Sequence, residues 1–210
     1  RFQNVEVTGV APNETTDFLK NETRTTSRIT PAYIYDSRDN FLNPSQGWRH
    51  VITSDLAGLG GMKFTRSMYE VVYYRPLIDK LVFGAHGRIN YATGYGGDTL
   101  PAFERYFMGG PTTLRGFTIQ DIGPKDKNGD PVGGSKALLL NLELQYPFTK
   151  SLRGFLFYDR GNVYGTGPDI SLTSEDYDLG EMRHSIGAGF RFMSPMGPLG
   201  FAYGIKLDPQ

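Results

Sequence analysis

Apolar residues recur at every second position over three segments of the chain, and this period constrains the fold more than any other feature. The clearest segment covers residues 137–146, where one face would carry Leu138, Leu140, Leu142, Leu144 and Tyr146. Residues 184–192 and 200–206 alternate in the same way, with mostly small or basic residues between the apolar ones. Successive side chains of a β-strand point to opposite faces, so each segment is predicted to be a strand with one apolar face.

Further strands are predicted from segments rich in β-branched and aromatic residues that end at turn residues. These segments are 29–37, 48–57, 64–75, 80–93 and 153–164, with a partial strand at 3–9. The total is about eight complete strands, and no helical stretch of comparable length competes. The predicted fold class is therefore all-β.

An alternating strand fits either the core of a soluble sandwich or the lipid-facing wall of a membrane barrel. The mean hydropathy of −0.37 and the lack of an apolar run of about 18 residues exclude a membrane-spanning helix. They do not exclude a barrel, because its strands carry polar residues at alternate positions. The 13 tyrosines and 14 phenylalanines favour strands and membrane interfaces.

The lengths of the connections favour the barrel. Short turns with proline are expected at 75–80, 146–151 and 194–198, a medium one near 36–47, and long connections at 94–135 and 165–182. Short and long connections thus tend to alternate, as they do when short turns are periplasmic and long loops lie outside. A short connection expected at 58–61, which is rich in glycine, departs from this pattern. We predict an antiparallel transmembrane β-barrel.

Several other functions find no support in the sequence. Basic and acidic residues number 22 each, which gives no case for a nucleic-acid partner, and the absence of cysteine excludes thiolate metal sites. Residues 126–130 look like the start of a calcium loop, but Ala137 stands where its bidentate carboxylate is needed. His50, His86 and His184 are widely spaced, and no Gly-x-Ser-x-Gly nucleophile turn occurs. We expect no catalytic residue, cofactor or metal.

Five motifs occur in order along the chain. The long connection contains GGPTTLRGF at 109–117, and the others are YDSRDN at 35–40, NLEL at 141–144, FLFYDRG at 155–161 and GAGFRFMSPMGPL at 187–199. Together these motifs resemble the BamA-like outer-membrane protein assembly factors of the bacterial surface antigen family. The likeness covers almost the whole chain. Arg-Gly-Phe alone would be a weak signal, whereas five motifs in order are specific.

The resemblance implies that the long connection folds back into the barrel and that Arg115 binds Asp159 and Glu143 there. Gly116 would supply tight backbone at the tip and Phe117 an apolar anchor. The other motif residues implied are Leu114 in the tip and Gly109, Gly110, Phe157 and Gly161 in support.

The alternation agrees with this arrangement, because it places both carboxylates on faces that can point into the lumen. A guanidinium binds two carboxylate oxygens together, which lysine does not reproduce.

The resemblance also implies a function and a place. Residues 1–210 are expected to be the C-terminal portion of a transmembrane β-barrel domain in the outer membrane of a Gram-negative-type bacterium. About eight of the family's roughly sixteen strands would be present, with the final strand missing and the start inside a longer protein. The expected role is non-enzymatic assembly and insertion of other outer-membrane proteins. The expected partners are unfolded clients, assembly-complex lipoproteins and outer-membrane lipid, with no nucleic acid.

Other interpretations stay open at this point. A two-partner secretion transporter shares the Arg-Gly loop and the strand with the aspartate, and it exports one dedicated substrate. A passive porin would have an unplugged lumen, and an outer-membrane enzyme would need a nucleophile close to a histidine. At the level of single residues, Arg115 is alternatively a surface arginine, and residues 159–162 a turn that ends a strand.

Overall fold

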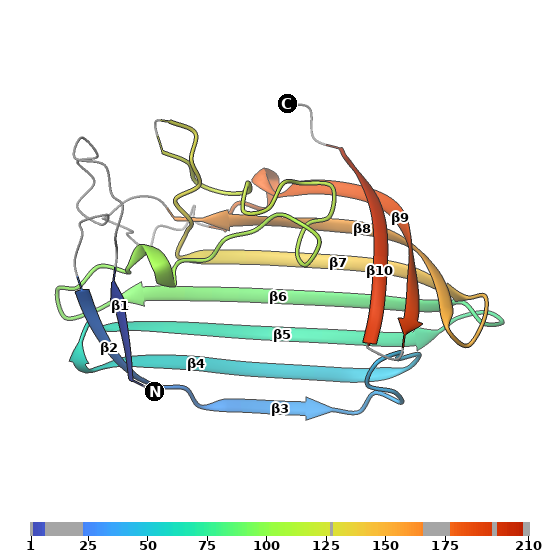
Figure 1. Cartoon of the computed structure of the whole chain (residues 1–210), viewed down its shortest axis with the longest axis horizontal. Coiled ribbons are helices and arrows are strands. Elements are labelled where there is room, and N and C mark those ends of the chain that lie inside the picture. Colours follow the sequence, from blue (N-terminus) through green and yellow to red (C-terminus); the bar gives the residue numbers. More distant parts are fainter. Residues whose placement is uncertain (1, 7–22, 127, 166–176, 195–196, 208–210) are drawn as a thin grey trace.

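The computed structural model describes residues 2–6, 23–126, 128–165, 177–194 and 197–207. One antiparallel sheet of ten strands dominates it (Figure 1), which confirms the all-β class. The strands are β1 (Phe2–Glu6), β2 (Thr23–Ile29), β3 (Ala32–Asp36), β4 (Gly47–Gly61), β5 (Phe64–Pro76), β6 (Val82–Gly94), β7 (Lys136–Pro147), β8 (Leu152–Tyr164), β9 (Arg183–Ser194) and β10 (Gly197–Lys206). Strand neighbours follow chain order from β1 to β10, except that β2 and β3 both pair with β4.

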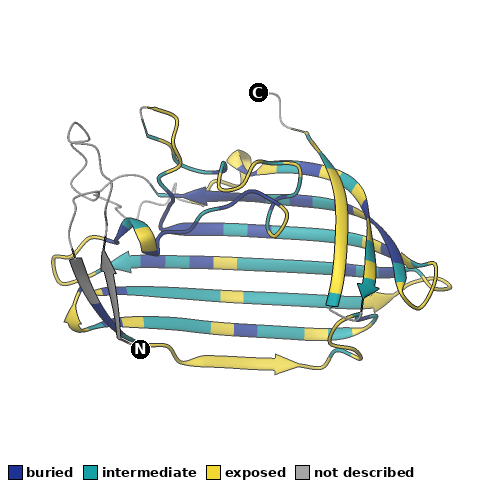
Figure 2. Cartoon of the chain, in the orientation of Figure 1, coloured by how far each residue is buried: buried dark blue, intermediate teal, exposed yellow. Residues whose placement is uncertain are grey.

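The two faces that the alternation predicts are present on β7. Leu139 and Gln145 are 2% and 1% exposed, whereas Leu144 and Tyr146 are 41% and 38% exposed. Figure 2 shows buried residues alternating with half-buried ones along parts of the neighbouring strand β6. Large apolar side chains that are exposed continue this outer surface over Leu156, Ile186, Phe190, Phe192, Leu199, Phe201, Tyr203 and Ile205. An outer face of this kind suits hydrocarbon, and the opposite face is the one that carries charge.

The sheet is strongly curved, and the long connection between β6 and β7 lies on its concave side (Figure 1). Apolar residues of this connection pack against inward side chains of the strands in one buried cluster. The connection contributes Leu100, Tyr106, Met108, Leu114 and Ile122, and the strands contribute Ala57, Phe64, Ala92, Ala137, Leu139 and Val163. The concave side is therefore filled by the chain itself, which positions the loop over β7 and β8.

Two details of the predicted strands were wrong. The single strand expected at 29–37 is interrupted at Pro31, which has no N–H to donate to a ladder, so β2 and β3 pair separately with β4. The connection expected at 58–61 lies within β4. There the register against β2 shifts between Thr26 and Arg28, so the glycines allow an irregular strand instead of ending it.

A loop tyrosine explains one of these glycines. Gly58 has φ +152°, and a Cβ there would lie 2.3 Å from the Tyr95 hydroxyl oxygen. That hydroxyl donates to the Ala57 carbonyl at 2.5 Å. Glycine thus admits the loop side chain against the β4 backbone. Of the partial strand expected at 3–9, residues 3–6 belong to β1 and the remainder lies outside the described residues.

Short and long connections leave opposite ends of the sheet. The turns at 37–46, 77–81 and 148–151 lie at one end, and the long β6–β7 connection lies at the other (Figure 1). The two-residue link between β4 and β5 lies at the end with the long connection. No helix among the described residues is long and apolar enough to cross a membrane.

Candidate functional site

The loop that carries Arg115 is closed at its base and turns tightly above it. The Ile122 amide donates to the Met108 carbonyl at 3.0 Å, and the Gly110 amide donates to the Leu114 carbonyl at 3.1 Å. Gly109 has φ +117°, and a Cβ there would lie 2.3 Å from the Thr118 carbonyl oxygen. Gly110 has φ +94°. The two glycines are needed for this turn because L side chains rarely adopt such backbone.

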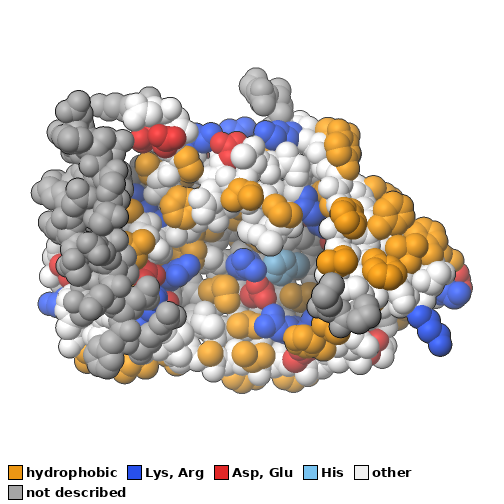
Figure 3. All heavy atoms as spheres, in the orientation of Figure 1, with side chains coloured by type: hydrophobic (Ala, Val, Ile, Leu, Met, Phe, Trp, Pro, Cys, Tyr) orange, Lys and Arg blue, Asp and Glu red, His pale blue; other side chains and the backbone are white. Residues whose placement is uncertain are grey.

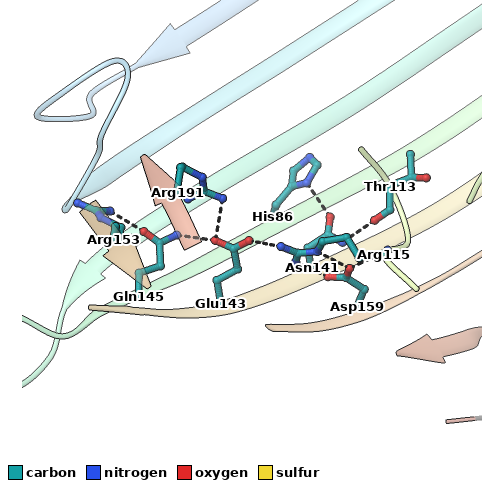
Figure 4. Close-up of polar contacts among 9 residues, drawn as sticks. All are labelled: His86, Thr113, Arg115, Asn141, Glu143, Gln145, Arg153, Asp159 and Arg191. Atoms are coloured by element: carbon teal, nitrogen blue, oxygen red, sulfur yellow. Dashed lines mark hydrogen bonds and ion pairs between the residues drawn. The ribbon is translucent and has the colours of Figure 1, made fainter. Parts of the chain in front are cut away.

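Arg115 binds two carboxylates on the inner wall (Figure 4). Its Nε and Nη2 donate to the two oxygens of Asp159 at 2.7 Å and 2.6 Å, and its backbone amide donates to the same carboxylate at 3.1 Å. Its Nη1 donates to Glu143 Oε1 at 2.5 Å. The side chain of Asp159 is fully buried. The planar guanidinium therefore binds carboxylates of two neighbouring strands, β7 and β8, at the same time.

Aromatic rings lie beside the ion pair. The Arg115 Cζ is 3.8 Å from the ring centroid of Phe157 and 5.6 Å from that of Phe155. Both rings fit because β9 carries glycine opposite them. A Cβ at Gly187 would lie 2.6 Å from the Phe157 ring, and one at Gly189 would lie 2.5 Å from the Phe155 ring. The small residues of the β9 motif thus make room for the surface on which the guanidinium stacks.

Leu114 and Gly161 fit together below the tip. Leu114 is fully buried, and a Cβ at Gly161 would lie 2.8 Å from its Cδ1 and 2.6 Å from Met108 Sδ. Gly161 is therefore the position on β8 that lets the loop approach the wall.

The far side of the tip lies against β10. Gly116 has φ +87°, and a Cβ there would lie 3.0 Å from the Gly204 carbonyl carbon. Phe117 packs at the border of the buried cluster, with Lys206 Nζ 5.0 Å from its ring centroid. The structure thus brings Arg115, Leu114, Phe157, Gly161 and both carboxylates together. It places Gly116 and Phe117 toward β10, and Gly109 and Gly110 in the turn that shapes the loop.

Sequence reasoning missed a second polar connection to the loop. Asn141 Nδ2 donates to the Thr113 carbonyl at 2.8 Å, and its Oδ1 lies 2.9 Å from His86 Nδ1. His86 Nε2 in turn lies 3.3 Å from Glu70, which also binds Arg88. The sequence held a signal for Asn141, because it lies two residues before Glu143 and therefore shares the polar face of β7.

Glu143 has partners besides Arg115. Gln145 Nε2 donates to it at 2.6 Å, and Arg191 Nη2 lies 3.5 Å away. Arg153 Nη1 continues the row by donating to Gln145 Oε1 at 2.5 Å (Figure 4). This row of polar side chains runs from the loop tip toward the end with the short turns.

The motif at 35–40 shapes the turn that meets this row. Burial would raise the pKa of Asp39, but hydrogen bonds from the Ser45 hydroxyl and from the amides of Ser45 and Gln46 lower it. The turn so held presents the Pro44 carbonyl, which accepts from Arg153 Nη1 at 2.9 Å. The turn between β3 and β4 thereby contacts β8, which lies four strands away from β4 in the sheet.

A polar cavity of about 330 Å³ remains between the loop and the wall. Its lining includes Glu70, Arg88, Glu143 and Arg191 from the strands and residues 111–113 from the loop. Figure 3 shows charged side chains gathered in the middle of this side, while hydrophobic ones cover the end near β9 and β10. Groups of both signs line the space, so it suits no single class of charged ligand.

The other polar segments considered from the sequence have local roles. The Asp126 carboxylate accepts the backbone amides of Asn128 and Asp130, each at 2.8 Å, which is an ordinary turn. His50 contacts the Tyr69 hydroxyl at 2.9 Å and His184 the Tyr158 hydroxyl at 2.5 Å. Among the residues that the structure describes, no group of three His, Cys, Asp or Glu could hold a metal ion.

Comparison with known proteins identifies the family. The model of the Omp85 superfamily domain matches residues 1–210. The chain belongs to the Omp85 superfamily. Among solved structures, this Omp85 chain is similar to BamA from Haemophilus ducreyi lacking POTRA domains 1–3, with 25% identity and a TM-score of 0.79. The likeness covers 91% of this chain and 41% of that one.

Curated relatives of this Omp85 chain come from bacteria and from animals. The outer membrane protein assembly factor BamA of Nitratidesulfovibrio vulgaris is 31% identical over 84% of this chain and 22% of the relative. BamA of Neisseria meningitidis is 25% identical over 95% and 30%, respectively. The human sorting and assembly machinery component 50 homolog is 31% identical over 78% and 37%. The chain thus spans well under half the length of each of these relatives.

Proposed function

We propose that this chain is the C-terminal part of a barrel that assembles and inserts other outer-membrane proteins. The observation that carries the proposal is the docked loop, in which Arg115 joins Asp159 and Glu143 across two strands. The names of the relatives, an outer membrane protein assembly factor and a sorting and assembly machinery component, support the same role.

The proposed mechanism needs no enzymatic step. A strand edge offers unpaired backbone donors and acceptors, to which an incoming client strand adds by hydrogen bonding. The docked loop would hold β7, β8 and β10 in a fixed curvature while another part of the barrel opens. No catalytic residue, cofactor or metal is assigned to this role.

The proposed partners follow from this mechanism. They are unfolded outer-membrane proteins as clients, lipoproteins of an assembly complex, and the lipid that surrounds the apolar outer face, with no nucleic acid. The proposed location is the outer membrane of a Gram-negative-type bacterium. The relatives are named as assembly components, which favours this role over the secretion transporter, the porin and the enzyme considered above.

Replacing Arg115 tests the proposal. In the full-length protein, Arg115→Ala removes the guanidinium, and Arg115→Lys keeps the charge but loses the fork that spans both carboxylates. Removing one partner of a buried pair costs about 3–5 kcal/mol, so Arg115→Ala should release the loop. Arg115→Lys should release it as well, because a single ammonium group cannot reproduce the donors that bind both carboxylates. We expect a severalfold fall in folded outer-membrane proteins, measured by their heat-modifiable migration in cells depleted of the wild-type protein.

Arg183→Ala is the matched control, because Arg183 is an exposed arginine on β9. It should support normal assembly. If both Arg115 variants assemble clients at the rate of the control while their loops are shown to be released, the proposed role of the docked loop is wrong.

A further inference from the structure

A second buried ion cluster holds the long loop at a different point. Glu104 ends the short 3₁₀ helix η2 (Ala102–Glu104) and is 5% exposed. Its Oε2 accepts from Arg28 Nη1 on β2 at 3.2 Å and from Arg66 Nη1 on β5 at 3.3 Å. The charges are reversed relative to Arg115, since here the loop supplies the carboxylate and the wall supplies the guanidinium groups. We call residues 102–106 the loop root.

Contacts of Tyr106 fix the loop root as well. The Arg66 Cζ lies 4.7 Å from the ring centroid of Tyr106, whose hydroxyl donates to the Ser67 carbonyl at 3.1 Å. Tyr106 and Gly134 exchange backbone hydrogen bonds of 2.8 Å and 3.0 Å. Glu104 is therefore held in one place, so the carboxylate itself loses little further conformational freedom when it binds the arginines.

One of these arginines lies where the sheet is least regular. The β2–β4 register shifts between Thr26 and Arg28, so backbone pairing is interrupted beside Arg28. Arg28 Nη1 also binds Asp55 on β4 at 3.3 Å. Side-chain ion pairs to two carboxylates thus act where the ladder supplies fewer hydrogen bonds than between the middle strands.

We propose that Glu104 is a second positioning residue, which ties the irregular β2–β4 pairing to the loop root. Arg115 ties the loop tip to β7 and β8, so the loop connects two separate parts of the inner wall. The importance of this connection for assembly rests on the proposed function. The restraint that Glu104 places on β2 does not depend on that function.

Hydrogen–deuterium exchange on the full-length protein in lipid nanodiscs separates the two ends of the loop. Glu104→Gln keeps the size of the side chain and removes the charge. We expect amide exchange in residues 23–29 and 102–106 to rise roughly tenfold, with residues 136–164 unchanged, because local opening is limited by local contacts. Arg115→Lys should give the opposite pattern, with faster exchange at 111–118 and none added at 23–29.

Asp130→Asn is the matched control, since it removes the same charge from an exposed position of the same loop. Unchanged exchange at 23–29 in Glu104→Gln, or an equal rise in every strand, would overturn the inference. If Glu104→Gln gives no heat-modifiable barrel, Arg28→Gln is measured in the same way, with the same two outcomes deciding. Normal client assembly in the Arg115 variants would count against the proposed function and leave this inference standing.

Discussion

The two carboxylates that hold Arg115 are not equivalent. Asp159 is fully buried and accepts three hydrogen bonds from Arg115, one of them from the backbone. Glu143 accepts one from Arg115, and Gln145 and Arg191 are close to it as well. Loss of the aspartate charge therefore leaves the guanidinium with more unsatisfied donors than loss of the glutamate charge.

Asp159→Asn should accordingly release the loop more than Glu143→Gln does. We expect a loss of about 3–5 kcal/mol for the buried pair and about 1 kcal/mol for the glutamate. The measurement is the rate at which a protease cuts residues 109–122 in the purified full-length protein. Equal rates in the two variants would contradict this ranking.

Close packing at β8 makes a second prediction at this scale. Gly161→Ala would put a methyl group 2.6 Å from Met108 Sδ and 2.8 Å from the Leu138 carbonyl oxygen. Such overpacking costs about 1–3 kcal/mol and should displace Leu114. The measurement is the unfolding temperature, monitored by the loss of heat-modifiable migration, and we expect it to be lower in the variant.

Gly200→Ala serves as the control, because its Cβ would meet nothing nearer than an oxygen 4.0 Å away. A fall in unfolding temperature as large for Gly200→Ala as for Gly161→Ala would show that strand propensity, not packing, is the cause.

At the scale of the strands, alternation predicted the faces of three strands, and composition together with turn residues located most of the others. Residues 184–192 and 200–206 required no other signal, because one face of each is apolar except at His184. The pattern failed where the ladder itself is irregular, at Pro31 and around Gly58. Neither the interruption nor the shift changes which residues are apolar. Pro31 itself interrupts the first strand, whereas the extended path of β4 through Gly58 accommodates a residue distant in sequence, Tyr95.

In the candidate site, too, some residues were predicted from the sequence and others were missed. Motifs along the chain indicated the tip and its two carboxylates, since the resemblance supplied that pairing. Asn141 and Glu104 were missed because each is an ordinary polar residue until the folded loop brings a partner to it. Alternation places Asn141 on the polar face of β7, but the contacts that give both residues their roles span 28 and 76 residues of sequence, and no local pattern names those partners.

Asn141 allows a prediction on how β7 holds the loop. Asn141→Leu keeps a side chain of similar size but leaves the Thr113 carbonyl without this donor and His86 without this partner. We expect a cost of about 1–3 kcal/mol in loop opening. Protease cutting of the loop should rise while Arg115 stays bound. Unchanged cutting would show that Arg115 alone determines loop position.

For the whole molecule, the outer apolar face predicts that the cost of a charged substitution depends on how deep the residue lies in the bilayer. Leu156 lies within β8, is 60% exposed and pairs with Leu144, whereas Ile78 is 81% exposed in a turn at the end of the sheet. Leu156→Arg should cost about 2–4 kcal/mol in a bilayer, and Ile78→Arg about 0–1 kcal/mol. The check is the yield of folded full-length protein in lipid vesicles. Similar yields for the two variants would argue against a lipid-facing surface.

The contact between Gly116 and Gly204 limits how far β10 can slide along β9. A two-residue slip is the smallest that keeps the same face inward, and it would bring Ala202 or Lys206 opposite the loop tip. A Cβ at that place would lie 2.9 Å from the Gly116 amide nitrogen, so neither residue fits. The docked tip therefore fixes the alignment of β10 with β9, and we expect β10 to change its register only when Gly116 moves away from it.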